Sequence, residues 1–453
     1  MNLDDTIVAI ATPPGRGGIG VVRLAGPDAR NVVMPMLRLS AGKIELEPQH
    51  AHYGELIDPD SGECFDEVVV TYFAKPRSYT TDDIVEISCH GSPVLLARVV
   101  ELALAKGVRM ADPGEFTMRS FLNGRIDLTQ AEAVRDLIES QTLYQAKVAA
   151  QQLGGSVSRR IQPIKQQLVN LIAVLEAGID FADDDVSVLP AEQALARIAE
   201  VREPLSKLQE GFAFGKVVHQ GLTLAIVGRP NVGKSSLFNR LVERDRAIVT
   251  AIPGTTRDLV TETVSLGGIP VHLVDTAGIR ESLDEAERFG IQKSREAMAD
   301  ADLVLVIVDA HADIDELDQQ LISEAAERSA ILVENKIDLG RHSATNGWKL
   351  PIVRTSATTG EGIAELREQI LRMVSGESGR EESGFLTNLR QHQLVTDALA
   401  GLASAENAIR LRIPHEMVLM DLYNALRPLD EITGATTADD ILNLIFSTFC
   451  IGK

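Results

Sequence analysis

The sequence is poor in cysteine and contains no long apolar run. Its three cysteines, Cys64, Cys89 and Cys450, have no metal-ligand spacing and cannot pair evenly, which favours a reducing cytoplasm. No apolar stretch approaches the length that spans a membrane, and the first ten residues lack the basic region of a secretion signal. We therefore expect a soluble, cytoplasmic protein with no membrane partner.

The sequence also has fewer basic than acidic residues. Lysine and arginine number 44 against 65 aspartates and glutamates, which gives a net charge of −21. Such a chain is a poor non-specific binder of nucleic acid, because phosphate backbones are negative as well. Any RNA contact is therefore expected to be local or shared with a partner.

The N-terminal quarter of the chain is predicted to be rich in strands. With 453 residues the chain is too long for one core. Residues 3–120 read as short strands separated by turns, with one apolar helix at 95–104. The segment Gly15–Gly20 matches a dinucleotide-binding glycine pattern, but two prolines precede it and a strand-like segment follows. We interpret it as a glycine-rich hairpin.

Helical periodicity begins near Thr129. Thr129 and Glu132 have the spacing of a capping box, which predicts a helix start there. A second apolar stripe runs from Ile161 to Leu175 and a third from Leu195 to Leu205. Pro204 is expected to kink or divide the third helix.

The remaining pattern predicts an inserted α/β domain. Strands and helices alternate between residues 222 and 374, which is typical of a parallel sheet with crossovers. Helical periodicity returns after a polar linker at 375–384, and the acidic segment 181–185 is a cation site or, more simply, a solvated loop. We predict a multidomain α/β and α fold, with an N-terminal α+β domain at 1–120, a helical domain at 121–216 and 378–453, and an inserted P-loop domain with a Ras-like, mostly parallel sheet at 217–377.

A glycine-bearing loop between a strand and a helix is the strongest chemical signal. Residues Gly228–Ser236 read GRPNVGKSS, after the apolar run Leu222–Val227 and before an apolar helical pattern. Such a loop turns its N–H groups toward one anion, and the helix N-terminus adds to that field. Lys234 is expected to reach the outer phosphates, and the Ser235 hydroxyl to bind Mg²⁺.

Two downstream motifs complete a phosphate and magnesium site. DTAG (Asp275–Gly278) ends a buried strand, so Asp275 is expected to hold Mg²⁺ through water and the Gly278 N–H to meet the γ-phosphate. PGTTRD (Pro253–Asp258) supplies Thr256 as the second hydroxyl for Mg²⁺.

Two more motifs predict recognition of guanine. In NKID (Asn335–Asp338), the carboxylate of Asp338 can accept the ring N–H and the exocyclic amine of guanine, whereas adenine would leave it unpaired. In SAT (Ser356–Thr358), a backbone N–H is expected to reach the guanine carbonyl. The predicted contacts to GTP and its metal ions are Gly228, Asn231, Val232, Gly233, Lys234, Ser235, Ser236, Thr250, Thr255, Thr256, Asp275, Thr276, Ala277, Gly278, Asn335, Lys336, Asp338, Ser356, Ala357 and Thr358.

One expected residue is missing. Ras-like enzymes place a glutamine after DTAG to orient the attacking water, but this position is Ile279, which cannot form a hydrogen bond. Either hydrolysis is slow or another group supplies the function. Arg280, Glu281 and Glu287 are the nearby polar candidates, and each is otherwise an ordinary surface-loop residue.

The combination of motifs resembles one family over essentially the whole chain. The motifs that support the resemblance are ATPPGRGGIGVVRLAG near the N-terminus, PGEFTMRSFLNGRIDLTQAEAV in the middle, GRPNVGKSSLFN, AIPGTTRD, DTAGIRE and the terminal CIGK. Together they resemble the tRNA-modification GTPase MnmE (TrmE) family. That resemblance implies an N-terminal tetrahydrofolate-binding and dimerising domain, a helical domain and an inserted G domain.

The resemblance also implies an activity and partners. Members work with an FAD-dependent partner, MnmG (GidA), to install an aminomethyl-type (carboxymethylaminomethyl) group on C5 of the wobble uridine of certain tRNAs. It implies a homodimer, a heterotetramer with the flavoprotein, tRNA contacted mainly through that complex, and potassium-dependent GTP hydrolysis. The cofactors would be GTP, Mg²⁺, K⁺ and a 5-formyl or methylene tetrahydrofolate.

Residues carry over from this family motif by motif. Arg23, Glu86, Arg125 and Lys453 match the folate-contacting positions, although Arg125 stands where some members have lysine. The potassium site is matched by Asn231, Thr250, Ile252 (through its backbone) and Thr255. Glu287 matches the glutamate that orients water, so the catalytic candidates are Glu287, Asn231, Arg280 and Cys450.

Two of these candidates keep open alternatives. Cys450 is either a thiolate nucleophile or a small apolar anchor that continues Phe446 and Phe449. Asn231 either directs an amide oxygen at a potassium ion that replaces an arginine finger, or hydrogen-bonds within its loop.

Two other kinds of GTPase are alternatives to this family. A ribosome-assembly GTPase would need a basic RNA-binding appendage or a GXXG loop in a KH-like unit, whereas the sequence after the predicted G domain has the pattern of acidic or neutral helices. The cytosolic G module of an iron transporter would need membrane helices.

Overall fold

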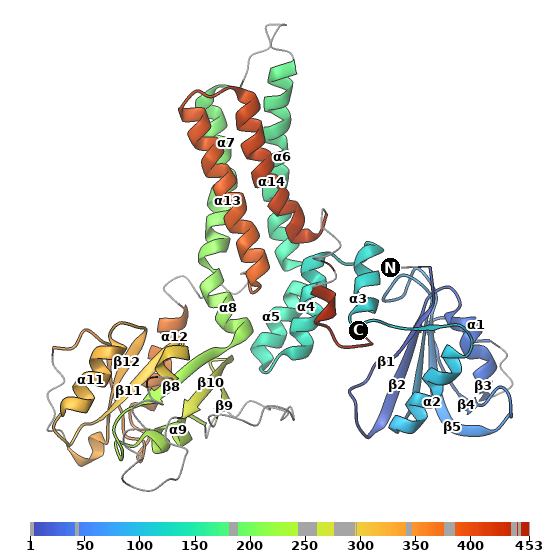
Figure 1. The fold of residues 1–453 in the computed structure, drawn as a ribbon, viewed down its shortest axis with the longest axis horizontal. Helices are drawn as coiled ribbons and strands as arrows, with labels where there is room; N and C mark the ends of the chain where they lie inside the picture. The colour runs from blue at the N-terminus through green and yellow to red at the C-terminus, as the bar shows by residue number, and fades with distance from the viewer. Residues whose placement is uncertain are drawn as a thin grey trace. The chain divides into compact units, whose positions relative to one another are not determined.

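The computed structural model describes residues 4–40, 45–180, 189–242, 261–275, 295, 297–340, 347–375, 386–435, 442 and 445–452. The chain divides into two compact units, one formed by 1–135 with 430–453 and the other by 136–429. This division is coarser than the four predicted segments, which stay a prediction. Figure 1 labels the elements of both units.

The first unit is built on a seven-stranded sheet with the order β3-β4-β5-β6-β2-β1-β7. All neighbouring strands are antiparallel except β1 and β7, which are parallel. The strands are β1 (Ile7–Ile10), β2 (Gly17–Ala25), β3 (Leu37–Leu39), β4 (Ala51–Ile57), β5 (Cys64–Phe73), β6 (Ile84–Gly91) and β7 (Arg109–Met110).

Helices cover both faces of this sheet. The helical elements are α1 (Ala29–Val33), η1 (Met34–Met36), α2 (Pro93–Leu104), α3 (Glu115–Leu122) and the start of α4 (Leu128–Glu139). Alternation in β5 puts Val68 and Val70 in the core with α1 and α2, while Glu67 and Val69 face outward. On the opposite face, Phe116 of α3 packs with residues of β1. The N-terminal α+β prediction is thus confirmed.

The glycine-rich segment forms the predicted hairpin. Residues 11–16 connect β1 to β2, and Ala9 pairs with Arg23 across the two strands. A Cβ on Gly20 would lie 2.6 Å from Leu96 Cδ1, so a side chain there would force the Leu96 side chain of α2 to move. The glycines allow close packing of a helix on a strand and do not form a dinucleotide loop.

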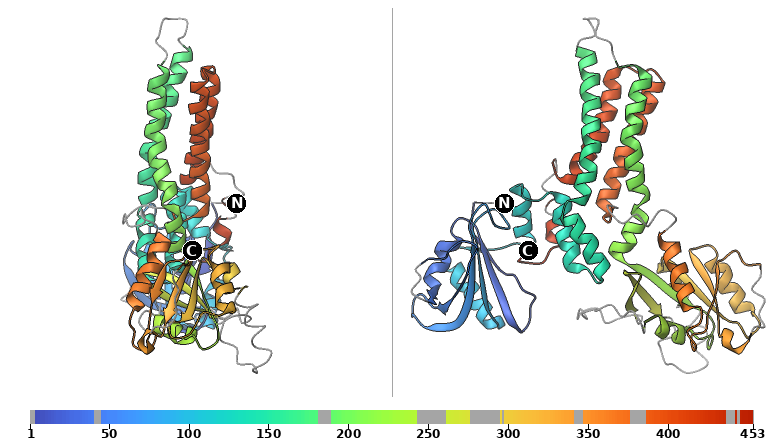
Figure 2. Two further views of the ribbon diagram at one scale, coloured as in Figure 1. Left: turned by 90° about the vertical axis from the view of Figure 1, so that its left-hand side faces the viewer. Right: turned by 180° about the vertical axis from the view of Figure 1, so that it is seen from behind.

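The second unit contains long helices. They are α5 (Leu143–Leu153), α6 (Ser156–Asp180), α7 (Ala191–Glu210), α8 (Phe212–Gln220), α13 (Leu389–Arg410) and α14 (His415–Thr433). Helices α6, α7, α13 and α14 run side by side in Figures 1 and 2. Their buried stripes include Ile161, Leu168, Ile198 and Leu402, which are fully buried. Pro204 lies inside α7, which continues without a break to Glu210, so the predicted division of this helix is wrong.

An α/β layer interrupts these helices. Its six-stranded sheet has the order β13-β12-β11-β8-β10-β9, parallel except for the β9–β10 hairpin. The elements are β8 (Leu222–Val227), α9 (Lys234–Val242), β9 (Thr261–Leu266), β10 (Ile269–Asp275), β11 (Leu303–Asp309), α11 (Glu316–Ala325), β12 (Ala330–Asn335), η4 (Ile337–Leu339), β13 (Ile352–Arg354) and α12 (Ile363–Ser375). The predicted mostly parallel sheet is confirmed.

Candidate functional site

At two positions of the loop between β8 and α9, the backbone adopts a conformation that only glycine tolerates. Gly228 has φ of 151° and Gly233 has φ of 98°. A Cβ on Gly228 would lie 2.4 Å from the Ile307 carbonyl oxygen, and one on Gly233 would lie 2.2 Å from Asn335 Nδ2. The loop is therefore packed tightly against the ends of β11 and β12, where parallel α/β sheets bind ligands.

The polar side chains of this loop lie at the start of α9. Lys234 Nζ donates to the carbonyl oxygens of Gly228 and Arg229, at 2.8 and 2.7 Å. Ser235 and Ser236 are exposed in the first turn of α9, and Val232 is buried beneath the loop. The helix N-terminus, the lysine and the hydroxyls form a donor set that fits phosphates and a hydroxyl-bound Mg²⁺.

Asn231 occupies an unusual backbone conformation. Its φ is 64°, in the left-handed region that non-glycine residues rarely adopt, and its side chain is exposed. In the described part of the chain, that side chain makes no hydrogen bond within the loop. The alternative in which Asn231 only stabilises its own loop therefore has no contact to support it.

Asn335 joins the NKID and SAT segments to the loop between β8 and α9. Its side chain is 1% exposed, and its Nδ2 donates to the Val232 carbonyl at 2.9 Å. Its Oδ1 accepts from the Ala357 N–H at 3.1 Å and from the Thr355 hydroxyl at 3.3 Å. One buried amide thus fixes three segments that are far apart in sequence.

The rest of NKID and SAT surrounds this amide. Lys336, with φ of 67°, forms an ion pair with Asp309 at 2.7 Å, whereas Asp338 is exposed in η4. Ser356 and Ala357 are buried, and Thr358 is exposed. Arg240 of α9 donates to the Ala357 and Thr358 carbonyls at 3.0 and 2.6 Å, which holds the SAT loop against the helix that follows the phosphate loop.

Several predicted residues lie outside the described part of the chain. They are Thr250, Ile252, Thr255, Thr256, Thr276, Ala277, Gly278, Arg280, Glu287 and Lys453. Asp275 is the last residue of β10, and its side chain is not described. The potassium and water-orienting assignments at these positions stay predictions.

A second group of predicted residues meets in the first unit. Arg23 of β2 and Glu86 of β6 are paired across the two strands, and Arg23 Nη2 lies 2.7 Å from Glu86 Oε1. Arg23 Nη1 also donates to the Gly452 carbonyl at 3.3 Å. The C-terminal tail therefore reaches a pair that is 429 residues away in sequence.

Glu86 and Arg125 line the same cavity. It has a volume of about 880 Å³, and its lining includes Gln49, Ser78, Tyr79, Asn123 and Gly124. Arg125 donates to the Ser78 carbonyl at 2.7 Å and lies 5.3 Å above the Tyr79 ring. Burial raises the pKa of the Tyr79 hydroxyl, although Thr117 and the guanidinium groups of Arg23 and Arg125 act in the opposite direction.

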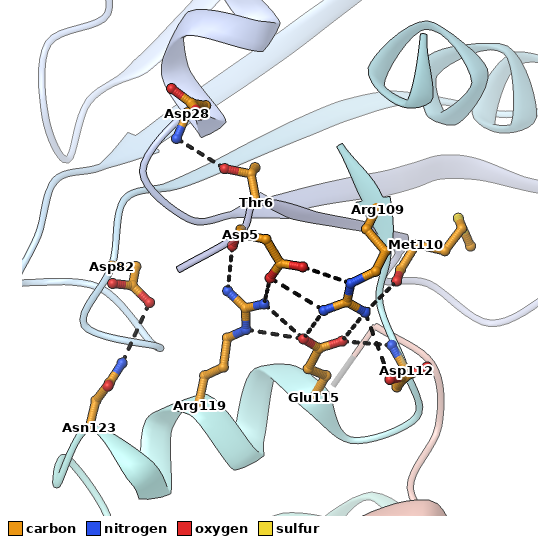
Figure 3. Close-up of polar contacts among 10 residues, drawn as sticks. All are labelled: Asp5, Thr6, Asp28, Asp82, Arg109, Met110, Asp112, Glu115, Arg119 and Asn123. Carbon is orange, nitrogen blue, oxygen red and sulfur yellow. Dashed lines mark hydrogen bonds and ion pairs between the residues drawn. The ribbon is translucent and has the colours of Figure 1, made fainter. Parts of the chain in front are cut away.

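A buried ion network supports α3, which leads to this cavity (Figure 3). Arg119 is fully buried, and its Nη2 bonds to Glu115 Oε1 at 2.8 Å and to Asp5 Oδ1 at 2.5 Å. Arg109 bonds to the same two carboxylates at 2.7 and 2.8 Å. Burial would raise the pKa of Asp5 and of Glu115, but the hydrogen bonds from the two arginines outweigh it and hold each pKa below its ordinary value.

The sequence did not single out Tyr79, Asn123 or Arg119. Asn123 follows α3, donates to the Thr80 carbonyl at 2.7 Å and lines the cavity. Only the family motif at residues 113–134 indicated this region, and it gave no role to these side chains. Cys450 is exposed, and its carbonyl oxygen accepts from the Gly114 N–H at 3.4 Å.

Comparison with known proteins shows the family to which the chain belongs. A family model described as the TrmE GTP-binding protein N-terminus matches residues 6–125, and one described as the MnmE helical domain matches 128–450. The chain is 87% identical over 454 residues to a tRNA modification GTPase MnmE of Koribacter versatilis, with all of both chains covered. The chain belongs to the MnmE (TrmE) family of tRNA modification GTPases.

More distant MnmE relatives and solved structures are also similar. A tRNA modification GTPase MnmE of Aquifex aeolicus is 45% identical over 451 residues, covering 99% of this chain and 100% of the relative. The G domain of the T. maritima FeoB iron transporter is 30% identical, with a TM-score of 0.26, and covers 34% of this chain and 98% of its own. A TM-score this low carries no argument about the whole fold.

Two negative findings apply to the residues described above. None of their helices has the length and apolar character needed to cross a bilayer. No group of three or more His, Cys, Asp or Glu among them is arranged to hold a metal ion.

Proposed function

We propose that this protein is a potassium-dependent GTPase that acts in the cytoplasm with an FAD-dependent partner of the MnmG (GidA) type. It uses a tetrahydrofolate one-carbon unit to install an aminomethyl-type group on C5 of the wobble uridine of certain tRNAs. The observation that carries the proposal is the Asn335 amide, which ties a phosphate loop to a guanine-reading segment. Membership of a tRNA modification family supplies the context.

Specificity for GTP is assigned to Asp338. Asp338 is exposed in η4, which follows the buried strand β12, and the N–H of its neighbour Ile337 donates to the Thr355 carbonyl, just before the SAT loop, at 3.3 Å. A carboxylate accepts two N–H groups of guanine, whereas an adenine nitrogen would face it as a second acceptor. GTP would therefore be selected and ATP rejected.

Hydrolysis is assigned to residues around the phosphate loop. Lys234 and the N-terminus of α9 neutralise phosphate charge, and Ser235 with Thr256 would hold Mg²⁺. A potassium ion at Asn231, Thr250, Ile252 and Thr255 would neutralise the charge that an arginine finger neutralises elsewhere. The exposed amide of Asn231, in its left-handed conformation, supports this assignment. Glu287 is proposed to orient water, with Arg280 nearby.

A reduced folate is assigned to the cavity lined by Glu86 and Arg125. A pterin presents adjacent N–H donors that suit a carboxylate, and its glutamyl tail suits guanidinium and ammonium groups. Arg23, Arg125 and Lys453 supply those cations, and the Tyr79 ring offers an apolar face. The volume of about 880 Å³ is ample for a folate.

The assembly is proposed to be a homodimer that joins the flavoprotein in a heterotetramer, in which tRNA is contacted.

The thiol of Cys450 is either a nucleophile or an anchor in this scheme. Cys450→Ser is expected to retain GTP hydrolysis in both cases. Lost tRNA modification with intact folate binding would favour the nucleophile.

Calorimetry on the full chain tests the two sites separately. Glu86→Gln and Arg125→Ala should weaken binding of 5-formyltetrahydrofolate by roughly tenfold or more, because each removes a charged hydrogen bond of ~1.5–3 kcal/mol. GTP affinity should stay unchanged in both. Lys234→Ala should weaken GTP binding and leave the affinity for folate unchanged. Arg38 forms an exposed ion pair with Glu55, so Arg38→Ala serves as the control. Unchanged folate affinity in both cavity variants would contradict the folate assignment.

A further inference from the structure

Arg229, in the loop between β8 and α9, forms contacts that the proposed function does not use. Its Nη1 lies 2.5 Å from Asp315 Oδ2, and its Nη2 lies 2.7 Å from Asp318 Oδ2. Nη2 also donates to the Asp313 carbonyl at 3.3 Å. One guanidinium thus connects this loop to the segment that leads into α11, and Asp315 is 86 residues away in sequence.

The two carboxylates belong to a helix start that is itself well held. Asp315 is the N-cap of α11, and its Oδ1 accepts from the Asp318 N–H at 3.0 Å in a reciprocal capping box. Further along α11, Leu321 and Ile322 are buried in a core cluster with residues of β11. The start of α11 is therefore a firm attachment point for the Arg229 side chain.

Burial makes this contact more than a surface ion pair. The side chain of Asp318 is 1% exposed, and that of Arg229 is 22% exposed. Burial raises the pKa of the Asp318 carboxyl, while the charge of Arg229 acts in the opposite direction. Removing Arg229 alone would leave this carboxylate buried without its guanidinium, which is strongly unfavourable.

The Arg229 contact holds the first half of the loop in a way that does not compete with a nucleotide. The second half is held by Asn335, which donates to the Val232 carbonyl. In the first half, Lys234 donates to the Gly228 and Arg229 carbonyls, but Lys234 is also the residue proposed to reach phosphates. The ion pairs of Arg229 are made to α11, so phosphate binding leaves them in place.

One stiff residue separates Arg229 from Asn231. Pro230 has its own φ locked near about −65° and restricts the backbone of the residue before it. The orientation of Arg229 is therefore transmitted to Asn231, whose φ is 64°. A non-glycine residue keeps such a conformation only when its surroundings fix it.

We propose that Arg229 is a positioning residue of the nucleotide site. By joining the loop to the capping box of α11, it holds Asn231 where its amide serves the potassium ion and the phosphates. This inference rests on the proposed function, and Arg229 itself touches neither the nucleotide nor the ion. Its loss should weaken the response to K⁺ more than the affinity for GTP, because the segments proposed to bind guanine are held by Asn335.

Three variants of the full-length protein separate positioning from folding. Arg229→Met removes the guanidinium alone. Arg229→Met/Asp315→Asn/Asp318→Asn removes all three charges, and the asparagine oxygens can still accept in the capping box of α11. Arg229→Lys keeps the charge, but one ammonium lacks the fork that reaches both carboxylates. The control is Arg295→Met, since Arg295 pairs with Glu324 at 2.5 Å, near the opposite end of α11.

The measurements are the unfolding temperature, GTP affinity by calorimetry, and the K⁺ concentration that half-saturates GTP turnover at constant ionic strength. Arg229→Met should unfold at a lower temperature and need about fivefold more K⁺ or beyond, the size that coupling between contacting residues reaches. The charge-free variant should regain the unfolding temperature and keep the K⁺ defect, and Arg229→Lys should be intermediate. GTP affinity should stay within about threefold of the parent value, and Arg295→Met should match the parent protein throughout.

Recovery of the K⁺ response together with the unfolding temperature in the charge-free variant would overturn the proposal, because the ion pairs would then serve folding alone. An unchanged response in Arg229→Met, or an equal shift in Arg295→Met, would overturn it as well. Equal rates of the parent protein in K⁺ and Na⁺ would count against the proposed function. Positioning is then judged by turnover at saturating GTP, which should fall about fivefold or more in Arg229→Met and in the charge-free variant. Turnover at the parent level in both would overturn it.

Discussion

Asn335 donates its side-chain amide to the Val232 carbonyl at 2.9 Å, and this bond connects the proposed guanine-reading segment to the proposed phosphate loop. The two residues lie on different strand–loop connections of the same sheet. The same amide accepts from the Ala357 N–H, so the segments proposed to recognise the nucleotide base and the phosphates share one buried side chain. Disturbing Asn335 should therefore affect both ends of the nucleotide.

Asn335→Ala is the first prediction. It would leave the Ala357 N–H and the Thr355 hydroxyl without their acceptor, and each unsatisfied buried group costs about 1–3 kcal/mol. We expect at least tenfold weaker binding of GTP and of xanthosine triphosphate alike, measured by calorimetry. Unaltered affinity for GTP would show that the loop keeps its shape without this amide.

Asp338→Asn should change the choice of base instead. The amide can donate to the extra oxygen of xanthine, whereas the guanine N–H groups lose a charged acceptor worth ~1.5–3 kcal/mol. GTP affinity is expected to fall and xanthosine triphosphate affinity to rise, in competition assays with a labelled nucleotide. If both nucleotides change in parallel, Asp338 is not the residue that distinguishes the bases.

The sequence located motifs well because each motif is local. The phosphate loop, NKID and SAT are short runs whose secondary structure could be predicted from their neighbours, and β8, α9 and β12 lie where the pattern put them. The start of α4 shows where prediction from the local pattern fails. Thr129 and Glu132 had capping-box spacing, but Asp127 and Gln130 form the reciprocal bonds, each at 3.0 Å. Both spacings fit the rule, and burial of Leu128 places the helix start earlier.

Contacts between distant segments could not be predicted from local pattern. Arg119 bonds to Asp5, which is 114 residues away, and nothing in the flanking sequence of either residue predicts the other. The same holds for the Gly452 carbonyl beside Arg23. The grouping of Arg23, Glu86 and Arg125 rested on family resemblance, and the fold explains it through pairing of β2 with β6 and through the end of α3.

Acid should weaken the first unit through the α3 network. The folded-state pKa values of Asp5 and Glu115 lie below their ordinary values of 3.8 and 4.5. Carboxyls of this kind contribute stability that is present above the unfolded-state pKa and is lost as the pH falls through the folded-state pKa. Calorimetric scans should therefore show a falling transition temperature below about pH 4.5.

Glu115→Gln should remove much of this pH dependence and lower stability at neutral pH. It leaves Arg119 buried with a neutral partner, and breaking a buried ion pair costs about 3–5 kcal/mol. Glu203→Gln, in an exposed pair with Lys207, is the matched control and should change little. An identical pH profile for the parent protein and Glu115→Gln would contradict a role for the network in acid stability.

The last prediction concerns potassium at Asn231. The missing glutamine at position 279 leaves water to be oriented by another group, and the charge between the β- and γ-phosphates still has to be neutralised. An amide oxygen repels phosphate but coordinates a hard cation, so an exposed asparagine in this loop suits a metal-bridged contact. Turnover should rise with K⁺ and fall when Na⁺ replaces it at equal ionic strength. Asn231→Ala should lose that response and still bind GTP, whereas Asn239→Ala, an exposed asparagine on α9, should keep it. Equal rates in the two salts for the parent protein would exclude the mechanism, since a screening effect alone does not distinguish two monovalent ions of the same charge.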